Sequence, residues 1–263
     1  MKRIDFHAHI FPDKIAVKAS ANVGAFYNIP MNYDGKVSTL LQLGDLGKID
    51  CFVVHSVATV PEQVENINNF IISTVKKHAG KFIGFATIHP DYHNIETEIN
   101  RIITLGFKGI KIHPDFQRFE INSIKACKIY EIIEGRLPIL IHTGDYRYEY
   151  SKPDRLAQIL DMFPRLDVIG AHFGGWSEWD IAARTLSGKN IYVDTSSSLY
   201  ALTPQKARQL INAFGIDYTL FGSDYPMWNP VNEIDLLEKI SLTYEETEKI
   251  MFKNAERLLK LHL

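Results

Sequence analysis

Short apolar runs rich in isoleucine, valine and phenylalanine recur along the chain and alternate with amphipathic stretches. Such runs are typical of parallel strands that are buried on both faces and joined by helices. We expect eight strands, at residues 2–9, 50–57, 82–89, 107–113, 138–143, 167–172, 190–195 and 218–224. Most strand ends lie about one strand-helix unit apart, so the pattern predicts an α/β fold, a (β/α)8 barrel in a single domain over residues 1–263.

Apolar residues at three-to-four spacing predict helices between these strands, for example at residues 64–75 and 156–163. Thr203, followed by proline, is expected to begin a later helix. Thr243 and Glu246 have the spacing of a capping box and predict the start of another. An open nucleotide-binding sheet is disfavoured because the glycine-rich loop that it requires is missing.

The first interval between predicted strands is longer than the others. Residues 10–33 precede the first predicted helix and include Phe11, Phe26 and Tyr27. The segments that follow barrel strands lie over the catalytic face. We therefore expect residues 10–33 to form an active-site loop.

Composition narrows the function classes. The chain has a formal net charge of -2, which supplies no field for holding a polyanion and disfavours nucleic acid as a partner. Its two cysteines, Cys51 and Cys127, are too few for a disulfide framework and fit a reducing cytoplasm. The sequence contains no run of about 18 apolar residues, so it predicts no membrane span. A cytoplasmic protein is expected, and a homo-oligomer remains open.

Histidines gather at the carboxyl ends of the predicted strands. His7 and His9 are two residues apart on one strand, so both imidazoles point to the same side. His142, His172 and Asp224 each close a later apolar run. A single histidine at a strand end is usually structural. The whole set, brought together at the mouth of a barrel, indicates a divalent metal that compensates the desolvated groups.

Five segments carry a family resemblance: IDFHAH, GFKGIKIHP, ILIHTG, IGAHFGG and LFGSDYP. With them the chain resembles the amidohydrolase superfamily, and within it the group of metal-dependent hydrolases and decarboxylases related to aminocarboxymuconate-semialdehyde decarboxylase. The resemblance implies that His7, His9, His142 and Asp224 ligate the metal and that His172 is either the catalytic histidine or an additional histidine of the metal site. We further expect the Gly174–Gly175 pair to let a substrate approach His172 closely.

The fourth predicted strand leaves alternatives open. Lys111 and His113 share one face, and the absence of an acid there disfavours a nuclease of the TatD type. Lys111 either bridges two metals as a carboxylated lysine, binds a substrate carboxylate or forms a structural ion pair. We expect an unmodified Lys111 and one metal, with zinc as the default because three imidazoles and a carboxylate suit it. His55 and His89 are expected to be structural.

The first functional hypothesis is a hydrolase of a small amide, ester or lactone, in which a metal-activated water attacks, Asp224 takes its proton and His172 polarises the carbonyl. The alternative is a nonoxidative decarboxylase of a small carboxylated substrate, in which the bound water or His172 protonates the substrate carbon. A third is a metal-containing binding protein without turnover, which the retained reactive groups disfavour. Lys111, His113 and Arg147 are candidate substrate contacts, the last because a guanidinium can fork onto a carboxylate.

Overall fold

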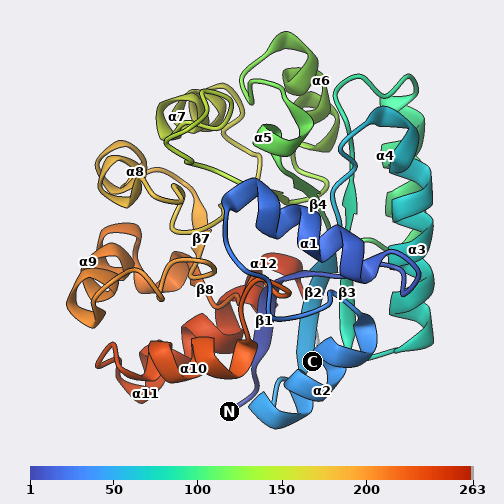
Figure 1. The fold of residues 1–263 in the computed structure, drawn as a ribbon. Helices are drawn as coiled ribbons and strands as arrows, with labels where there is room; N and C mark the ends of the chain where they lie inside the picture. Colours follow the sequence, from blue (N-terminus) through green and yellow to red (C-terminus); the bar gives the residue numbers. More distant parts are fainter. Residues whose placement is uncertain (262–263) are drawn as a thin grey trace.

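The computed structural model describes residues 1–261. Within this range eight parallel strands lie side by side in chain order and surround a central axis (Figure 1). They are β1 (Ile4–His9), β2 (Cys51–His55), β3 (Phe82–Thr87), β4 (Gly109–Ile112), β5 (Ile139–Ile141), β6 (Val168–Gly170), β7 (Tyr192–Asp194) and β8 (Thr219–Leu220). The predicted (β/α)8 barrel is confirmed, and each strand falls within its predicted range.

Hydrogen bonds between β1 and the segment after β8 close the barrel. The Phe6 amide donates to the Phe221 carbonyl at 2.8 Å, and the Asp224 amide donates to the His7 carbonyl at 2.7 Å. The buried Asp5 carboxylate accepts from the backbone and hydroxyl of Ser223 at 2.9 and 2.5 Å. These contacts fix Asp224 beside β1, although more than 200 residues separate the two in sequence.

Helices surround the strands as an outer ring (Figure 1). They include α2 (Val37–Gly47), α3 (Val64–Lys77), α4 (Ile95–Leu105), α5 (Pro114–Gln117), α6 (Ile124–Ile133), α7 (Pro153–Met162), α8 (Trp179–Leu186), α9 (Pro204–Phe214), α10 (Pro230–Glu238), α11 (Tyr244–Glu248) and α12 (Asn254–Leu259). The Thr203 cap and the capping box of Thr243 with Glu246 form as predicted. Among residues 1–261, no helix has both the length and the apolar character needed to cross a membrane.

Side-chain alternation separates the barrel interior from the layer beneath the helices. On β2, Cys51 and Val53 belong to the interior cluster, and Phe52 and Val54 belong to the outer one. On β1 the pairing register with β2 shifts between Asp5 and Ala8. Such an irregularity can re-aim side chains. Before the shift, Phe6 points into the barrel, and after it Ala8 and Ile10 point toward the helices. His7 and His9 therefore face the mouth of the barrel.

The segment predicted as an active-site loop is in part a helix. Helix α1 (Ala16–Tyr27) lies across the front of the barrel in Figure 1. Its buried positions are Ala16, Ser20 and Gly24, which repeat every four residues. Because these side chains are small, the helical face has no stripe of large apolar residues, and the pattern was missed. Asn28 ends the helix in the left-handed conformation, with a φ of 55°.

Candidate metal centre

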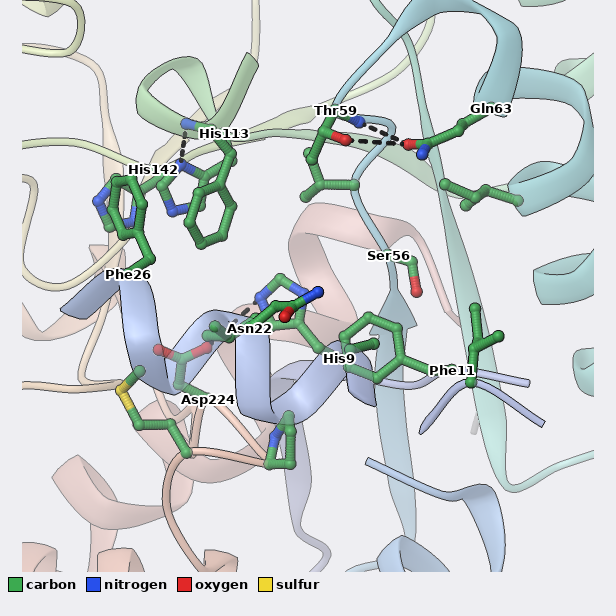
Figure 2. A pocket seen from close by; sticks show the side chains of 18 of the residues that line it. His9, Phe11, Asn22, Phe26, Ser56, Thr59, Gln63, His113, His142 and Asp224 are labelled. Atoms are coloured by element: carbon green, nitrogen blue, oxygen red, sulfur yellow. Dashed lines mark hydrogen bonds and ion pairs between the residues drawn. The ribbon is translucent and has the colours of Figure 1, made fainter. Parts of the chain in front are cut away.

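A cavity of about 550 Å³ opens at the carboxyl ends of the strands (Figure 2). Aromatic and apolar side chains from α1, α3 and the loops at the barrel mouth form most of its wall. His7, His9, His142, His172 and Asp224 also line it. Among residues 1–261, neither a lysine nor an arginine contributes to this lining. An anionic substrate would therefore find no cationic side chain on the wall.

Three of the predicted ligands form a triangle. His7 Nε2 lies 3.3 Å from His9 Nε2, and each of these nitrogens lies 3.4 Å from Asp224 Oδ1. Donor atoms bound at about 2.0–2.2 Å to one ion with tetrahedral angles lie about 3.3–3.6 Å apart. The other Asp224 oxygen accepts from Ser197 Oγ at 2.5 Å, which orients the carboxylate. The triangle thus fits one divalent ion.

The protonation states of His7, His9 and Asp224 favour metal binding. Burial lowers the pKa of His7 to about 4, so its imidazole is neutral at pH 7. Burial alone would raise the pKa of Asp224, but the neighbouring imidazoles, His7 first, outweigh it and hold that pKa well below its usual range. A metal needs deprotonated ligands. Burial also lowers the pKa of His9, so all three side chains can bind a metal at pH 7 without first losing a proton.

Asp194, at the end of β7, orients His7. Its Oδ2 lies 2.8 Å from His7 Nδ1, and both side chains are fully buried. The same carboxylate accepts from the backbone amides of His172 and Ser196 at 3.0 and 3.1 Å. As a carboxylate it can only accept, so the network assigns the His7 proton to Nδ1 and leaves the Nε2 lone pair facing the triangle. Carboxylate–histidine pairs of this kind are typical of metal sites.

Replacing Asp194 with asparagine is expected to weaken metal binding about 10–100-fold while the barrel stays folded. An amide group facing His7 Nδ1 can donate a hydrogen bond, which favours the tautomer with the proton on Nε2 and removes the lone pair from the triangle. Competition with a chelator would measure the affinity. Equal affinity in the wild type and in Asp194→Asn, with both proteins folded, would show that Asp194 does not control His7.

His142 and His172 form a second hydrogen-bonded unit. His172 Nδ1 lies 3.0 Å from the Ser196 carbonyl oxygen, so this nitrogen carries the proton. His172 Nε2 must then accept from His142 Nδ1, 3.0 Å away. The remaining lone pair, on His142 Nε2, faces Tyr27 Oη at 3.4 Å. The helix over the mouth is therefore connected through His142 to His172.

His142 is not part of the triangle in this structure. Its ring stacks on that of His113 with a centroid distance of 3.8 Å, and its Nε2 lies 3.6 Å from Asp115 Oδ2. His113 Nε2 in turn lies 2.7 Å from the hydroxyl of Tyr27. Of the four ligands implied by the resemblance, the structure gathers His7, His9 and Asp224 and places His142 in the adjoining cluster.

Of the candidate substrate contacts His113 and Lys111, only His113 lines the cavity. The contact of His113 with a substrate stays a prediction. Lys111 is fully buried, and its Nζ lies 3.3 Å from His7 Nε2, with a pKa that burial lowers to about 8. It is absent from the cavity lining within residues 1–261, so it has no direct access to a substrate carboxylate there.

Arg147 also has a role different from the predicted substrate contact. Its guanidinium makes two bonds to Asp145, at 2.9 and 2.7 Å, and donates to the Phe26 carbonyl at 2.7 Å. It also lies over the rings of Phe26 and Tyr148. Its donors are used to join the loop after β5 to α1, which explains why it does not line the cavity.

The glycines after His172 serve packing instead of substrate access. A Cβ on Gly174 would lie 2.9 Å from Leu186 Cδ1, and one on Gly175 would lie 2.7 Å from Ala182 Cβ. Both neighbours belong to α8. The pair therefore lets the turn approach this helix, and the expectation about substrate approach is wrong.

Two functional candidates were missed in the sequence. Asp194 closes an apolar run in the same way as Asp224, so the strand-end argument could have selected it. Tyr27 reaches the site from α1, and its contacts with His113 and His142 depend on that helix crossing the barrel. Burial raises the pKa of Tyr27 well above its usual value, so its hydroxyl keeps its proton.

Comparisons with known proteins agree with this architecture. The curated decarboxylase orsB of Emericella nidulans is 27% identical over 166 residues, which cover 61% of this chain and 45% of that relative. The alignment therefore spans less than half of the relative's length. A dihydroxybenzoic acid decarboxylase from Polaromonas sp. JS666, solved with manganese and the inhibitor 2-nitroresorcinol, has a TM-score of 0.73 at 17% identity and covers 99% of this chain and 97% of its own.

A probable 2-pyrone-4,6-dicarboxylic acid hydrolase from Acinetobacter baumannii, solved with citric acid, has a TM-score of 0.72 at 18% identity and covers 99% of this chain and 100% of its own. At these identities both structures show a shared fold. The model of one family, described as amidohydrolase, matches residues 4–261. Because that match spans nearly the whole sequence, this chain belongs to the amidohydrolase family.

Proposed function

We propose that this protein is a divalent-metal-dependent, nonoxidative decarboxylase of a small carboxylated aromatic substrate. The observation that carries the proposal is the triangle of His7, His9 and Asp224 beside an aromatic-lined cavity without lysine or arginine in the described lining. The decarboxylase relatives favour this alternative over the hydrolase that the sequence analysis put first.

The cavity wall suits a planar ring. Phe11, Phe26, Phe70 and Phe116 are among the side chains that line it. An apolar wall excludes water from a bound carboxylate, and loss of that hydration favours release of neutral carbon dioxide. Hydrolysis is less well supported because a carboxylate bound to a metal, as proposed for Asp224, is a weaker base for the attacking water than a free one.

A divalent ion held by His7, His9 and Asp224 would supply the positive charge that binds the substrate anion and stabilises the electron pair left when the carbon–carbon bond breaks. The carbon that loses carbon dioxide then takes a proton. His172 Nε2 is the proposed donor. His172 takes up this proton from water, and the Tyr27 hydroxyl keeps its own because burial raises its pKa. His172 returns to the neutral imidazole that its lowered pKa favours.

We propose zinc or manganese as the bound metal. Two imidazoles and a carboxylate accommodate zinc, the default from the sequence, and also manganese. The dihydroxybenzoic acid decarboxylase with a similar fold contains manganese. Loading the metal-free protein with each ion separately identifies the one that supports turnover.

Product analysis tests the reaction class. Protein loaded with zinc or manganese would be incubated in ¹⁸O-labelled water with two panels, one of hydroxybenzoates labelled with ¹³C in the carboxyl group and one of amides, esters and lactones. We expect labelled carbon dioxide from the first panel and no ¹⁸O in its organic product. Incorporation of ¹⁸O from the second panel, without carbon dioxide, would establish a hydrolase. A metal-loaded protein that turns over neither panel would support the binding protein.

A further inference from the structure

His55, at the end of β2, is a buried imidazole that the proposed mechanism does not use. Its exposed fraction is 0%. Both of its ring nitrogens are buried, and neither has a hydrogen-bond partner among residues 1–261. Its position at a strand end predicts a structural role for His55. A structural histidine of this kind would normally bond through at least one nitrogen.

Burying an imidazole without partners is unfavourable. A neutral imidazole carries one donor and one acceptor, and both lose water when the ring is buried. Nearly all buried polar groups in folded proteins are hydrogen-bonded, so an exception calls for a missing partner. A phenylalanine would fill this position without leaving two polar atoms unsatisfied. The two nitrogens therefore indicate that something binds His55.

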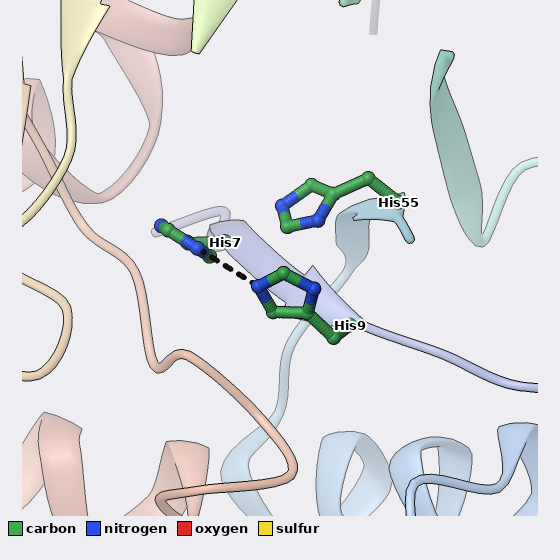
Figure 3. Close-up of side chains that lie close together, drawn as sticks. All are labelled: His7, His9 and His55. Carbon is green, nitrogen blue, oxygen red and sulfur yellow. Dashed lines mark hydrogen bonds between the residues drawn. The ribbon is translucent and has the colours of Figure 1, made fainter. Parts of the chain in front are cut away.

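The neighbours of His55 indicate what that partner is. Its ring centroid lies 4.3 Å from that of His9 and 4.9 Å from that of His7 (Figure 3). One donor atom from each of the three residues can be chosen so that all lie within 4.8 Å of one another. His55 pairs with His9 across β1 and β2, and two-residue alternation places it on the inward side with Val53.

We propose that His55 is a further ligand of the metal centre formed by His7, His9 and Asp224. This inference rests on the proposed metal centre and adds a ligand from β2. With His7, His9 and Asp224, His55 makes a set of three imidazoles and one carboxylate. Both nitrogens of His55 are without a hydrogen-bond partner among residues 1–261, so either can serve as the ligand atom.

His55→Phe tests this ligand because it retains an aromatic ring and removes both nitrogens. His89→Phe is the matched control, since His89 is also a buried histidine near the end of a barrel strand but does not belong to the cluster of His7, His9 and His55. Cobalt(II) is the probe because its visible absorption reports the number of ligands. We expect His55→Phe to weaken cobalt and zinc binding about 100-fold or more and to change the cobalt spectrum. Loss of an outer partner alone changes affinity about 10–100-fold.

His89→Phe should leave the affinity and the spectrum unchanged. Circular dichroism confirms folding, and His55→Gln, with the same expected losses, serves if the phenylalanine variant does not fold. A folded His55 variant with wild-type affinity and an unchanged cobalt spectrum overturns the proposal for His55 alone. A wild-type protein that binds neither ion overturns the metal centre itself and with it the proposed function.

Discussion

Replacing both His7 and His9 with alanine is expected to leave a folded barrel that has lost most of its divalent metal. The two imidazoles supply two corners of the triangle, and Asp224 alone offers a single carboxylate. We expect the metal affinity to fall more than about 100-fold, since this change removes two direct ligands and not an outer partner. Turnover should fall in proportion to the fraction of protein that still holds a metal ion.

The double variant also leaves Asp194 without its bond to His7. An unsatisfied buried acceptor costs about 1–3 kcal/mol, which a domain with about 5–15 kcal/mol of stability can tolerate. Elemental analysis after dialysis measures the metal, and circular dichroism checks the fold. A double alanine variant of His78 and His93, which lie outside the cavity lining, is the control. Undiminished metal in the folded His7 and His9 variant would rule out these ligands.

Replacing His172 with asparagine is expected to reduce turnover by about two orders of magnitude or more while the protein keeps nearly all of its metal. A positioned proton donor contributes about 10²–10⁴-fold in rate, or about 3 to 5 kcal/mol of barrier. His172 lines the cavity, but its two nitrogens contact Ser196 and His142, not the triangle. Asparagine can still donate to the Ser196 carbonyl, which preserves the local structure.

Metal content and turnover must be measured on the same preparation of His172→Asn. Metal lost in proportion to activity would make His172 a ligand. Wild-type turnover at full occupancy would make it a structural residue. The dependence of kcat on pH adds a separate test, because a variant that lacks only the proton donor should lose the ionisation that His172 contributes in the wild type.

The strands and half of the site were predictable because they follow from local pattern. Buried parallel strands are apolar along their whole length, and side chains that close such runs must meet at one end of a barrel. The rule that a side chain closing an apolar run lies at the barrel mouth predicts His172 and Asp224 from the sequence. The same rule applies to Asp194, which closes the run of β7.

The remaining features depend on contacts between distant segments. Helix α1 buries small residues, so its periodicity was weak, and Tyr27 reaches the site only because the helix crosses the mouth. Arg147 was expected to bind substrate, but its geometry depends on Asp145 and on the Phe26 carbonyl. In the sequence His55 cannot be distinguished from other lone histidines at strand ends. Only the register of β1 with β2 places it beside His9.

The metal stoichiometry of the wild-type protein tests the central claim most directly, because the decarboxylase, the role of Asp194 and the ligand His55 all depend on a metal centre. Protein stripped with a chelator would be dialysed against zinc, manganese or cobalt and its bound ion counted by elemental analysis. We predict about one divalent ion per chain, with Lys111 unmodified by intact mass. A folded protein that retains none of these ions would contradict the account.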